Sequence, residues 1–288
     1  MSLSGQNLSI VIVTLKSESV LHDCIKSINQ NIPVIVVENS NNYDLKKNLE
    51  SKYKNLKCVL TGQNLGMGSA NNKGIQLANT DYVYILNPDT TLEKNTLENL
   101  FLESKKIPNF SIISPVHSNE KNPNWKNIIE KNLDKSKPFK VDSIDGYSML
   151  LNKKILKDLY FDENFFLYLE NDDLCLRARK LGGSIFIIPS AKINHYGAKA
   201  VDSKYEKEIE LSRNWHWMWS KFYFNKKHYG FLKAFFEGCP SFISSIFKYL
   251  FFLLINNKIK KKIYLNRASG YFNALIGKSS WYRPNLND

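Results

Sequence analysis

Apolar stretches rich in β-branched residues alternate with stretches of helical periodicity along the first hundred residues. Strands are predicted over residues 8–15, 32–40, 56–62 and 81–90. Helices are predicted between them, where apolar residues recur every three to four positions, over 19–28, 44–53 and 68–78. This alternation is typical of a parallel sheet covered by helices on both faces. The sequence therefore predicts an α/β, Rossmann-like, mostly parallel sheet flanked by helices.

The alternation ends after about residue 105. Further strands are expected over 109–116, within 141–156 and over 184–197, and a polar loop over 117–138. A helix is expected after Asp172, ending near Gly182 and Gly183. The chain from about residue 205 has a helical pattern. We expect one domain over 1–204, with halves of about 1–104 and 105–204, and a helical tail over 205–288.

Polar residues stand at the ends of all four early strands. They are Thr14, then Glu38-Asn39-Ser40, Gly62-Gln63-Asn64 and Asn87-Pro88-Asp89. Ligands of open α/β sheets bind beyond the carboxyl ends of the strands. The pattern therefore indicates a nucleotide-binding crevice at this edge of the sheet.

Asn87 and Asp89, in the segment LNPDT, are candidate cation ligands. Mg²⁺ usually takes one or two protein carboxylates together with substrate phosphates. The same residues also make a good β-turn, and both interpretations stay open. His195, at the exit of the last predicted strand, is a candidate second ligand, although a lone histidine is more often structural.

The glycine-rich segment GQNLGMGSANNKG (62–74) does not match a dinucleotide fingerprint, because GxGxxG is absent after the first strand. Gly66 and Gly68 suit a turn that needs positive φ. Asn72 follows on the predicted helix, where it could face a diphosphate, as could its neighbours Asn71 and Lys73. Lys73 could equally be a solvated surface residue.

The segment FFLYLENDDLCLRARK (165–180) places three carboxyl groups and an amide where an apolar run meets a helix. Asn171 or Asp172 could cap that helix, and Asp173 could interact with its dipole. Asp173 also has Arg177 four residues on as an ion-pair partner. The alternative is that this acidic group supplies a catalytic base.

The net charge of +13 is concentrated in the tail. Residues 221–288 carry twelve basic side chains and two acidic ones, which is ten of the thirteen excess charges. The apolar run SFISSIFKYLFFLLI (241–255) is short for a membrane span and contains Lys248. Amphipathic contact with a membrane surface and packing as a helical subdomain are both open. Nucleic acid is not expected as a partner, because no nucleic-acid motif is recognised.

The four cysteines are scattered, with no CxxC pair, which favours reduced thiols in the cytoplasm and argues against a zinc site. Residues 1–10 lack the pattern of a secretory signal.

Seven segments occur in an order that resembles inverting family 2 glycosyltransferases of the GT-A fold. They are IVIVTLKSESVLHDCIKSI, VIVVENS, GQNLGMGSANNKGI, YILNPDT, IDGYSMLLNKKIL, DENFFLYLENDDLCLRARKLG and INHYG. The resemblance covers roughly residues 8–200 and is greatest to the bacterial rhamnosyltransferase-like branch. Residues 1–104 would then form the nucleotide-sugar half of the domain, and residues 105–204 the acceptor half.

The resemblance implies roles for particular residues. Asp89 would hold a divalent metal, Mg²⁺ or Mn²⁺, that bridges the donor diphosphate, and His195 would contact the same metal. Glu38 would bind the nucleoside, with Thr14 nearby. The other donor-binding candidates, at strand ends and in the glycine-rich segment, are Asn39, Asn64, Gly66, Asn72 and Asn87. Asp145 and Gly146 lie where the family lines the acceptor and donor-sugar pocket.

Two departures from the family pattern matter. Leu15-Lys16 stand where the family has Tyr-Asn or Phe-Asn, which affects contact with the base of the nucleotide. Asn171 stands where the family has the acidic residue regarded as its catalytic base, and an amide cannot accept a proton at neutral pH. Glu170 is therefore the first candidate for the catalytic base, and Asp172 the second.

The function implied is inverting transfer from a nucleoside-diphosphate sugar to a hydroxyl of a saccharide or lipid-linked acceptor, in surface polysaccharide synthesis. The resemblance suggests dTDP-rhamnose, and UDP-sugars stay open. The tail would hold the protein peripherally at the inner membrane face, and a homo-oligomer is possible. The alternative is a catalytically weak binding or scaffold subunit.

Overall fold

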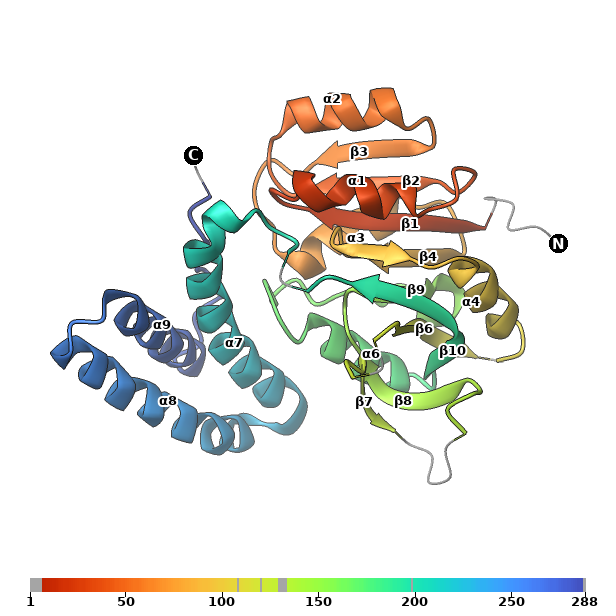
Figure 1. The fold of residues 1–288 in the computed structure, drawn as a ribbon. Helices are drawn as coiled ribbons and strands as arrows, with labels where there is room; N and C mark the ends of the chain where they lie inside the picture. The colour runs from red at the N-terminus through yellow and green to blue at the C-terminus, as the bar shows by residue number, and fades with distance from the viewer. Residues whose placement is uncertain (1–6, 108, 120, 129–133, 198, 287–288) are drawn as a thin grey trace. The chain divides into compact units, whose positions relative to one another are not determined.

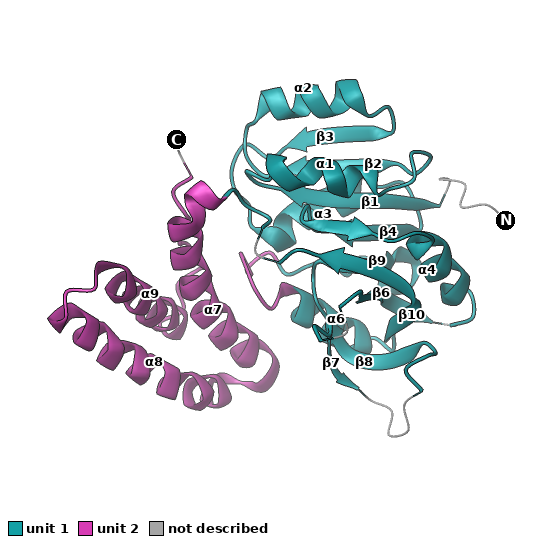
Figure 2. Cartoon of the chain, viewed as in Figure 1, with its two compact units in different colours: residues 1–162, 171–202 teal, residues 163–170, 203–288 magenta. Residues whose placement is uncertain are grey.

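The computed structural model describes residues 7–107, 109–119, 121–128, 134–197 and 199–286. The chain forms two compact units (Figure 2). Unit 1 comprises Met1–Asp162 and Asn171–Asp202, and unit 2 comprises Glu163–Glu170 and Ser203–Asp288. The short segment 163–170 thus groups with the C-terminal helices, although we expected it within the first domain.

Unit 1 is built on one mixed sheet with the strand order β3-β2-β1-β4-β9-β6-β10-β8-β7, and β5 pairs with β10 (Figure 1). The strands are β1 (Leu8–Thr14), β2 (Val34–Glu38), β3 (Leu56–Leu60), β4 (Tyr82–Leu86), β5 (Thr90–Leu92), β6 (Phe110–His117), β7 (Trp125–Ile128), β8 (Phe139–Ile144), β9 (Ser148–Asn152) and β10 (Ser184–His195).

The helices of unit 1 cover both faces of this sheet. They are α1 (Glu18–Lys26), α2 (Tyr43–Lys52), α3 (Met67–Leu77), α4 (Thr96–Ser104), α5 (Lys153–Leu156) and α6 (Glu170–Lys180), whose first residue, Glu170, groups with unit 2. One buried cluster joins side chains of α1, α2 and α4 to alternate residues of β1 and β2. A second buried cluster joins side chains of α3, α5 and α6 to the other alternate residues of β1 and β2, which face the opposite side of the sheet. Strands covered on both faces are apolar throughout, which is why β1 and β2 read as continuous β-branched runs.

The four strands β3-β2-β1-β4 are all parallel. Helix α3 lies so close to β1 that a Cβ on Gly74 would be 2.3 Å from Cγ1 of Val11. Glycine is therefore required at this position, because it lets α3 pack directly against the middle of β1.

Beyond β4 the sheet is mixed. Strand β9 is antiparallel to β4 and β6, and β10 is parallel to β6 but antiparallel to β5 and β8. The loop predicted over 117–138 is wrong in part, because Trp125–Ile128 forms β7 against β8. Residues 129–133 of that loop lie outside the described residues. The helix expected after Asp172 begins earlier, at Glu170, so the acidic group forms its first turn.

Unit 2 contains a short 3₁₀ turn (Ser203–Tyr205) and the helices α7 (Glu206–Tyr229), α8 (Phe231–Leu254) and α9 (Lys258–Leu275). Trp215, Trp219 and Phe222 of α7 form its core with Tyr271 of α9. A Cβ on Gly270 would lie 2.1 Å from the carbonyl oxygen of Trp215, so α7 and α9 are in backbone contact. Among the described residues, no helix has the length and apolar character needed to span a bilayer.

Candidate active site

Several buried polar atoms at the carboxyl edge of the sheet lack a hydrogen-bond partner among the described residues. They are Thr14 Oγ1, Asn87 Oδ1, Asp89 Oδ1 and Tyr147 Oη. Thr14 ends β1, Asn87 and Asp89 follow β4, and Tyr147 immediately precedes β9. The amide of Asn87 donates to the carbonyl of Tyr147 at 2.9 Å, which joins the last two segments. Because buried polar groups are nearly always hydrogen-bonded, this edge is suited to a polar ligand.

Asp89 and His195, which are far apart in the sequence, meet through the ladder between β5 and β10. Thr90 pairs with His195 in antiparallel register, and the amide of Tyr196 donates to the Asp89 carbonyl at 3.0 Å. Nε2 of His195 lies 3.5 Å from Oδ2 of Asp89, whose side chain is 1% exposed. The structure thus brings together the two residues predicted to hold a metal.

Two aromatic neighbours that the sequence did not single out contact His195, one at its ring and one at its backbone carbonyl. Tyr147 stacks on it with ring centroids 4.0 Å apart. His117 accepts a hydrogen bond from the Asn119 amide at Nδ1, so its Nε2 carries the proton and donates to the His195 carbonyl at 3.3 Å. Burial raises the pKa of the Tyr147 phenol, which therefore stays neutral.

The residues present fit a divalent metal that shares its coordination with a substrate. Among the described residues, no three His, Cys, Asp or Glu side chains gather closely enough to hold a metal ion. Asp89 and His195 form a pair, with the amide oxygen of Asn87 also buried nearby in sequence. One carboxylate and one imidazole leave coordination positions for diphosphate oxygens and water, as is usual for Mg²⁺ or Mn²⁺ bound with a nucleotide.

The donor-binding candidates after β2 and β3 lie together but are engaged with one another. The carboxylate of Glu38 accepts hydrogen bonds from the amide and hydroxyl of Ser40 and from the amide of Asn42. Asn39 donates to Asn64 Oδ1 at 3.1 Å and to the Gly66 carbonyl at 3.3 Å. Gly66 has a φ of +82° and precedes α3, so it makes the turn that needs glycine. These residues tie together the loops that follow β2 and β3.

Asn72 has a structural contact that the sequence did not predict. Its amide nitrogen donates to the carbonyl of Phe161, and its oxygen accepts from the Phe161 amide, both at 2.9 Å. Asn71, one residue earlier on α3, is buried with its Oδ1 unpartnered among the described residues. Of the two asparagines, Asn71 has the greater capacity for a new hydrogen bond to a ligand.

Asn171 supports the segment that carries Asp145 and Gly146. Its side-chain amide donates to the carbonyl of Ile144 at 2.7 Å, and a Cβ on Gly146 would lie 3.4 Å from the Asn171 Cβ. The amide therefore fixes the turn between β8 and β9. The pKa of the Asp145 carboxyl is raised, chiefly by burial. The charge of Lys126 opposes this shift, that of Asp172 adds to it, and that of His195 opposes it.

Asp172 is held by two partners that local sequence patterns did not indicate. Nζ of Lys126 lies 2.8 and 2.6 Å from its two carboxylate oxygens, and the hydroxyl of Ser143 donates to Oδ1 at 2.6 Å. Lys126 comes from β7, within the segment that the sequence predicted as a loop. Both oxygens of this carboxylate therefore already have partners within the protein.

Glu170 follows a strained turn of unit 2. Tyr168 and Leu169 have φ values of +70° and +66°, a conformation that costs a residue with a side chain about 1–2 kcal/mol. The preceding segment is anchored on α7, where the hydroxyl of Ser220 donates to the Leu167 carbonyl at 2.8 Å. Phe166 stacks on His216 with centroids 4.6 Å apart. The aromatic run thus serves to hold the turn from which α6 and its acidic group begin.

Comparison with known families decides the assignment. Residues 9–160 match the model described as glycosyl transferase family 2, which is more than half of the chain. The chain belongs to glycosyl transferase family 2. It is 28% identical over 193 residues to the low-salt glycan biosynthesis hexosyltransferase Agl10 of Haloferax volcanii, a match that covers 60% of this chain and 62% of Agl10. The match thus spans about three-fifths of that relative.

Two solved structures, each in complex with a nucleotide or nucleotide sugar, have the same fold. The mannosyltransferase PcManGT from Pyrobaculum calidifontis, in complex with GDP-Man and Mn²⁺, is similar with a TM-score of 0.57 at 12% identity over 93% of this chain and 87% of its own. TarS of S. aureus, in complex with UDP, is similar with a TM-score of 0.53 at 14% identity over 98% of this chain and 95% of its own. These likenesses establish the GT-A fold of the family 2 chain.

Proposed function

We propose that this family 2 protein transfers a sugar from a nucleoside-diphosphate sugar to a hydroxyl of a saccharide or lipid-linked acceptor. The observation that carries the proposal is the buried Asp89 carboxylate, with one oxygen unpartnered among the described residues and His195 beside it, at the carboxyl edge of the sheet. Such a carboxylate is costly in the absence of a cationic ligand, and a metal-bound diphosphate would supply one.

In the proposed site Asp89 and His195 would hold Mg²⁺ or Mn²⁺, which would neutralise charge on the departing diphosphate. Thr14, Asn71 and Asn87 would hydrogen-bond the donor through atoms that have no partner in the described chain. The loop built by Glu38, Asn39, Asn64 and Gly66 would bound the nucleoside, and Asp145 and Gly146 would line the acceptor side. Asn72 would position α3 through its bonds to Phe161.

The reaction we propose is a single displacement with inversion at the anomeric carbon. A base removes the proton of the acceptor hydroxyl as that oxygen attacks, and the bond to the diphosphate breaks. Glu170 is the favoured base, since Lys126 and Ser143 already hold Asp172, and Asn171 cannot accept a proton. A base of this kind contributes typically 10²–10⁴-fold to the rate.

We propose a donor among dTDP-rhamnose and the UDP-hexoses, which follows from the resemblance to the rhamnosyltransferase-like branch. Agl10 is named a hexosyltransferase, TarS was solved with UDP and PcManGT with GDP-Man. A thermal-shift panel of dTDP-, UDP- and GDP-sugars, each with and without Mg²⁺ or Mn²⁺, tests the proposal. One nucleotide sugar should raise the melting temperature in a metal-dependent way, because a ligand at 100 times its Kd stabilises by about 2.7 kcal/mol. If no member of the panel raises it, the proposal is wrong.

The second candidate function is a catalytically weak binding or scaffold subunit, which Asn171 favours. The two candidates differ in turnover. A scaffold subunit would show the metal-dependent thermal shift but no release of nucleoside diphosphate with any acceptor. Measurable release that is lost on substitution of Glu170 would support the enzyme.

We also propose that the protein works in the cytoplasm, peripherally at the inner face of the membrane, in surface polysaccharide synthesis. The support is the basic and aromatic composition of unit 2, which would bring the protein to a lipid-linked acceptor.

A further inference from the structure

Helix α8 buries small residues on one side and exposes large apolar side chains on the other. Ala234, Gly238 and Ser245 face the interior of unit 2 and are buried. A second row at helical spacing is 46–84% exposed and comprises Leu232, Phe236, Ile243, Phe247, Leu250 and Leu254. We call this row the outward face of α8. Contiguous exposed apolar surface of this kind marks a site of interaction with a partner or a membrane.

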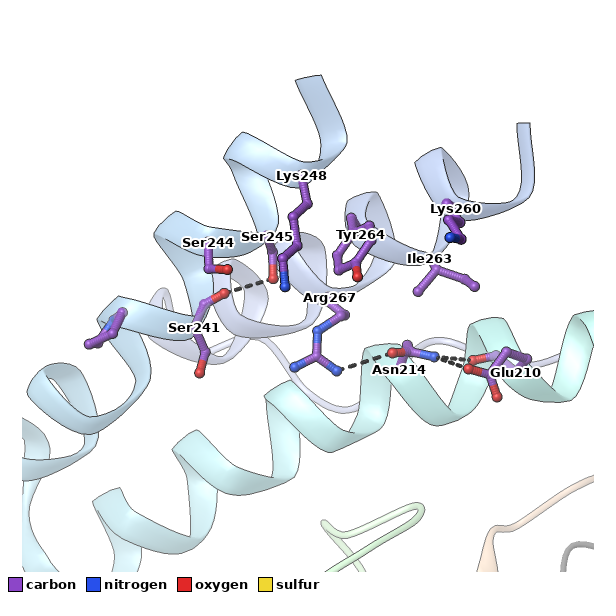
Figure 3. A pocket seen from close by; sticks show the side chains of 11 residues that line it. Glu210, Asn214, Ser241, Ser244, Ser245, Lys248, Lys260, Ile263, Tyr264 and Arg267 are labelled. Atoms are coloured by element: carbon purple, nitrogen blue, oxygen red, sulfur yellow. Dashed lines mark hydrogen bonds between the residues drawn. The ribbon is translucent and has the colours of Figure 1, made fainter. Parts of the chain in front are cut away.

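A cavity of about 580 Å³ lies among the three helices of unit 2 (Figure 3). Three cationic side chains line it, Lys248 of α8 and Lys260 and Arg267 of α9. One carboxylate, that of Glu210, also lines it, and it accepts a hydrogen bond from Asn214, whose oxygen in turn accepts from Arg267. Ser241, Ser244 and Ser245 add hydroxyl groups to the wall formed by α8. We call this cavity the basic pocket.

The lysines of the basic pocket are held by aromatic rings. Nζ of Lys248 lies 5.3 Å from the ring centre of Tyr264, and Nζ of Lys260 lies 5.1 Å from that of Phe252. These two rings stack on each other with centroids 5.5 Å apart. The described residues provide no ion pair for Lys248, Lys260 or Arg267. The pocket therefore has a net positive charge, which suits an anion with several oxygen acceptors.

The basic pocket and the outward face of α8 are continuous. Pro240, Ser244 and Lys248 line the pocket and also a second hollow of about 720 Å³, whose other walls include Phe236, Ile243 and Phe247. A ligand that fills both has an anionic group at one end and an apolar chain at the other. The lysine cluster 258–262 at the start of α9 adds further positive charge next to the exposed Leu254.

We propose that the basic pocket binds the phosphate group of an anionic membrane lipid while the outward face of α8 contacts the apolar part of the bilayer. Charge complementarity favours this occupant over a second copy of the chain, which would bring the same cations. The inference rests on the membrane-surface part of the proposed function and is independent of the transfer chemistry.

Vesicle flotation tests the proposal with phosphatidylcholine vesicles and with vesicles that also contain phosphatidic acid. The wild-type protein should bind the second kind much more tightly. The double variant Lys248→Gln/Arg267→Gln should lose about 30-fold in affinity, or about 2 kcal/mol, since each basic residue near an anionic surface contributes about 1 kcal/mol. The control Lys226→Gln/Lys278→Gln removes the same charge outside the pocket and should lose much less. An equal loss in the control would overturn the pocket assignment.

Two further measurements exclude other occupants. Phe236→Ser/Phe247→Ser alters two exposed positions and should weaken binding to anionic vesicles with the melting temperature retained. A dimer in light scattering that these substitutions abolish would assign the face to a second copy and overturn the proposal. Stabilisation by glycerol phosphate without vesicle binding would assign the pocket to a soluble phosphate and also overturn it.

The transfer chemistry is monitored in parallel. Because none of these residues belongs to the candidate active site, donor hydrolysis should be unchanged in every variant. Loss of vesicle binding with hydrolysis retained tests the lipid site alone, whereas absence of hydrolysis in the wild type would count against the proposed transferase and leave the vesicle result to stand by itself.

Discussion

Asp89 is a buried carboxylate at the carboxyl edge of the sheet, directly after β4. Substitution by asparagine keeps the shape of the side chain and removes the charge that would hold the metal. We expect Asp89→Asn to lower the transfer rate by about 10²–10³-fold, the range typical for loss of one group that stabilises developing negative charge. The metal-dependent thermal shift with the donor should disappear.

Asp158→Asn removes an exposed carboxylate and provides the control for this change. It should leave the rate and the thermal shift unaltered. Without ligands, Asp89→Asn should melt at the wild-type temperature or above, because it removes a buried charge. A variant that keeps both the rate and the metal response would show that Asp89 is not the metal ligand.

Glu170 and Asp172 are the two candidate bases, and kinetics should separate them. We expect Glu170→Gln to lower kcat by about 10²–10⁴-fold, as removal of a general base does. Asp172→Asn should have a smaller effect, because Lys126 and Ser143 engage that carboxylate. Measurement of kcat and KM for both variants decides the order. A larger loss for Asp172→Asn would make Asp172 the base, and no loss in either would refute both assignments.

At the scale of elements, the turn before α6 depends on α7. Ser220 is fully buried, and its hydroxyl satisfies the carbonyl of Leu167 next to the strained Tyr168 and Leu169. We expect Ser220→Ala to lower the free energy of unfolding by about 1–3 kcal/mol, the cost of leaving a buried acceptor without its donor. Urea denaturation measures this change, and the transfer rate should fall because the turn leads directly to Glu170.

Ser245→Ala is the matched control in the same unit. Its hydroxyl donates to the carbonyl of Ser241 four residues earlier on α8, a group that the helix itself can hydrogen-bond. Its removal should therefore change stability by much less. Equal losses in the two variants would mean that the Ser220 bond does not hold the turn.

The elements that the sequence predicted well are those with local signals. Periodicity located β1 to β4 and the helices between them, because strands buried on both faces and amphipathic helices have distinct patterns. Strand β7 was missed because it is only four residues long, three of them exposed, and because it is defined by pairing with β8. The start of α6 was predicted three residues late, because Tyr168 and Leu169 make an abrupt left-handed turn without glycine.

For the whole molecule, His216 links stability to pH. Its Nε2 donates to the Tyr282 carbonyl and its Nδ1 accepts from Ser280, an arrangement that only the neutral ring can make. Burial lowers the pKa of His216 to about 3, from 6.5. Between these values the unfolded chain binds a proton that the folded chain does not, so stability is lost as pH falls below about 6.5.

The lost stability amounts to about 2 kcal/mol between pH 7.5 and pH 5. Urea denaturation across this range should show the loss in the wild type. Glutamine at this position can keep both hydrogen bonds but does not titrate. Between pH 7.5 and pH 5 the unfolding free energy of His216→Gln should therefore fall by about 2 kcal/mol less than that of the wild type. Identical pH profiles for the two proteins would mean that His216 does not control this dependence.

The sequence by itself determined the α/β class, the helical C-terminal region and the strand ends where the polar residues gather. The class and the helical region follow from the spacing of apolar residues, which is a local property of the sequence. The position of the strand ends follows from the rule that parallel strands have their carboxyl ends at one edge of the sheet, which holds for any such fold. The strand-end rule is also what singled out Asp89 and Asn87 before any contact was known.

Only the tertiary structure decided how distant residues combine. The ladder between β5 and β10 sets His195 beside Asp89, β7 brings Lys126 to Asp172, and α7 anchors Phe166 ahead of Glu170. Each pair joins segments between 46 and 106 residues apart, and no local pattern specifies such a contact. The physical reason is that the chemistry of a side chain depends on its neighbours in space. These neighbours are determined by how whole strands and helices pair and pack.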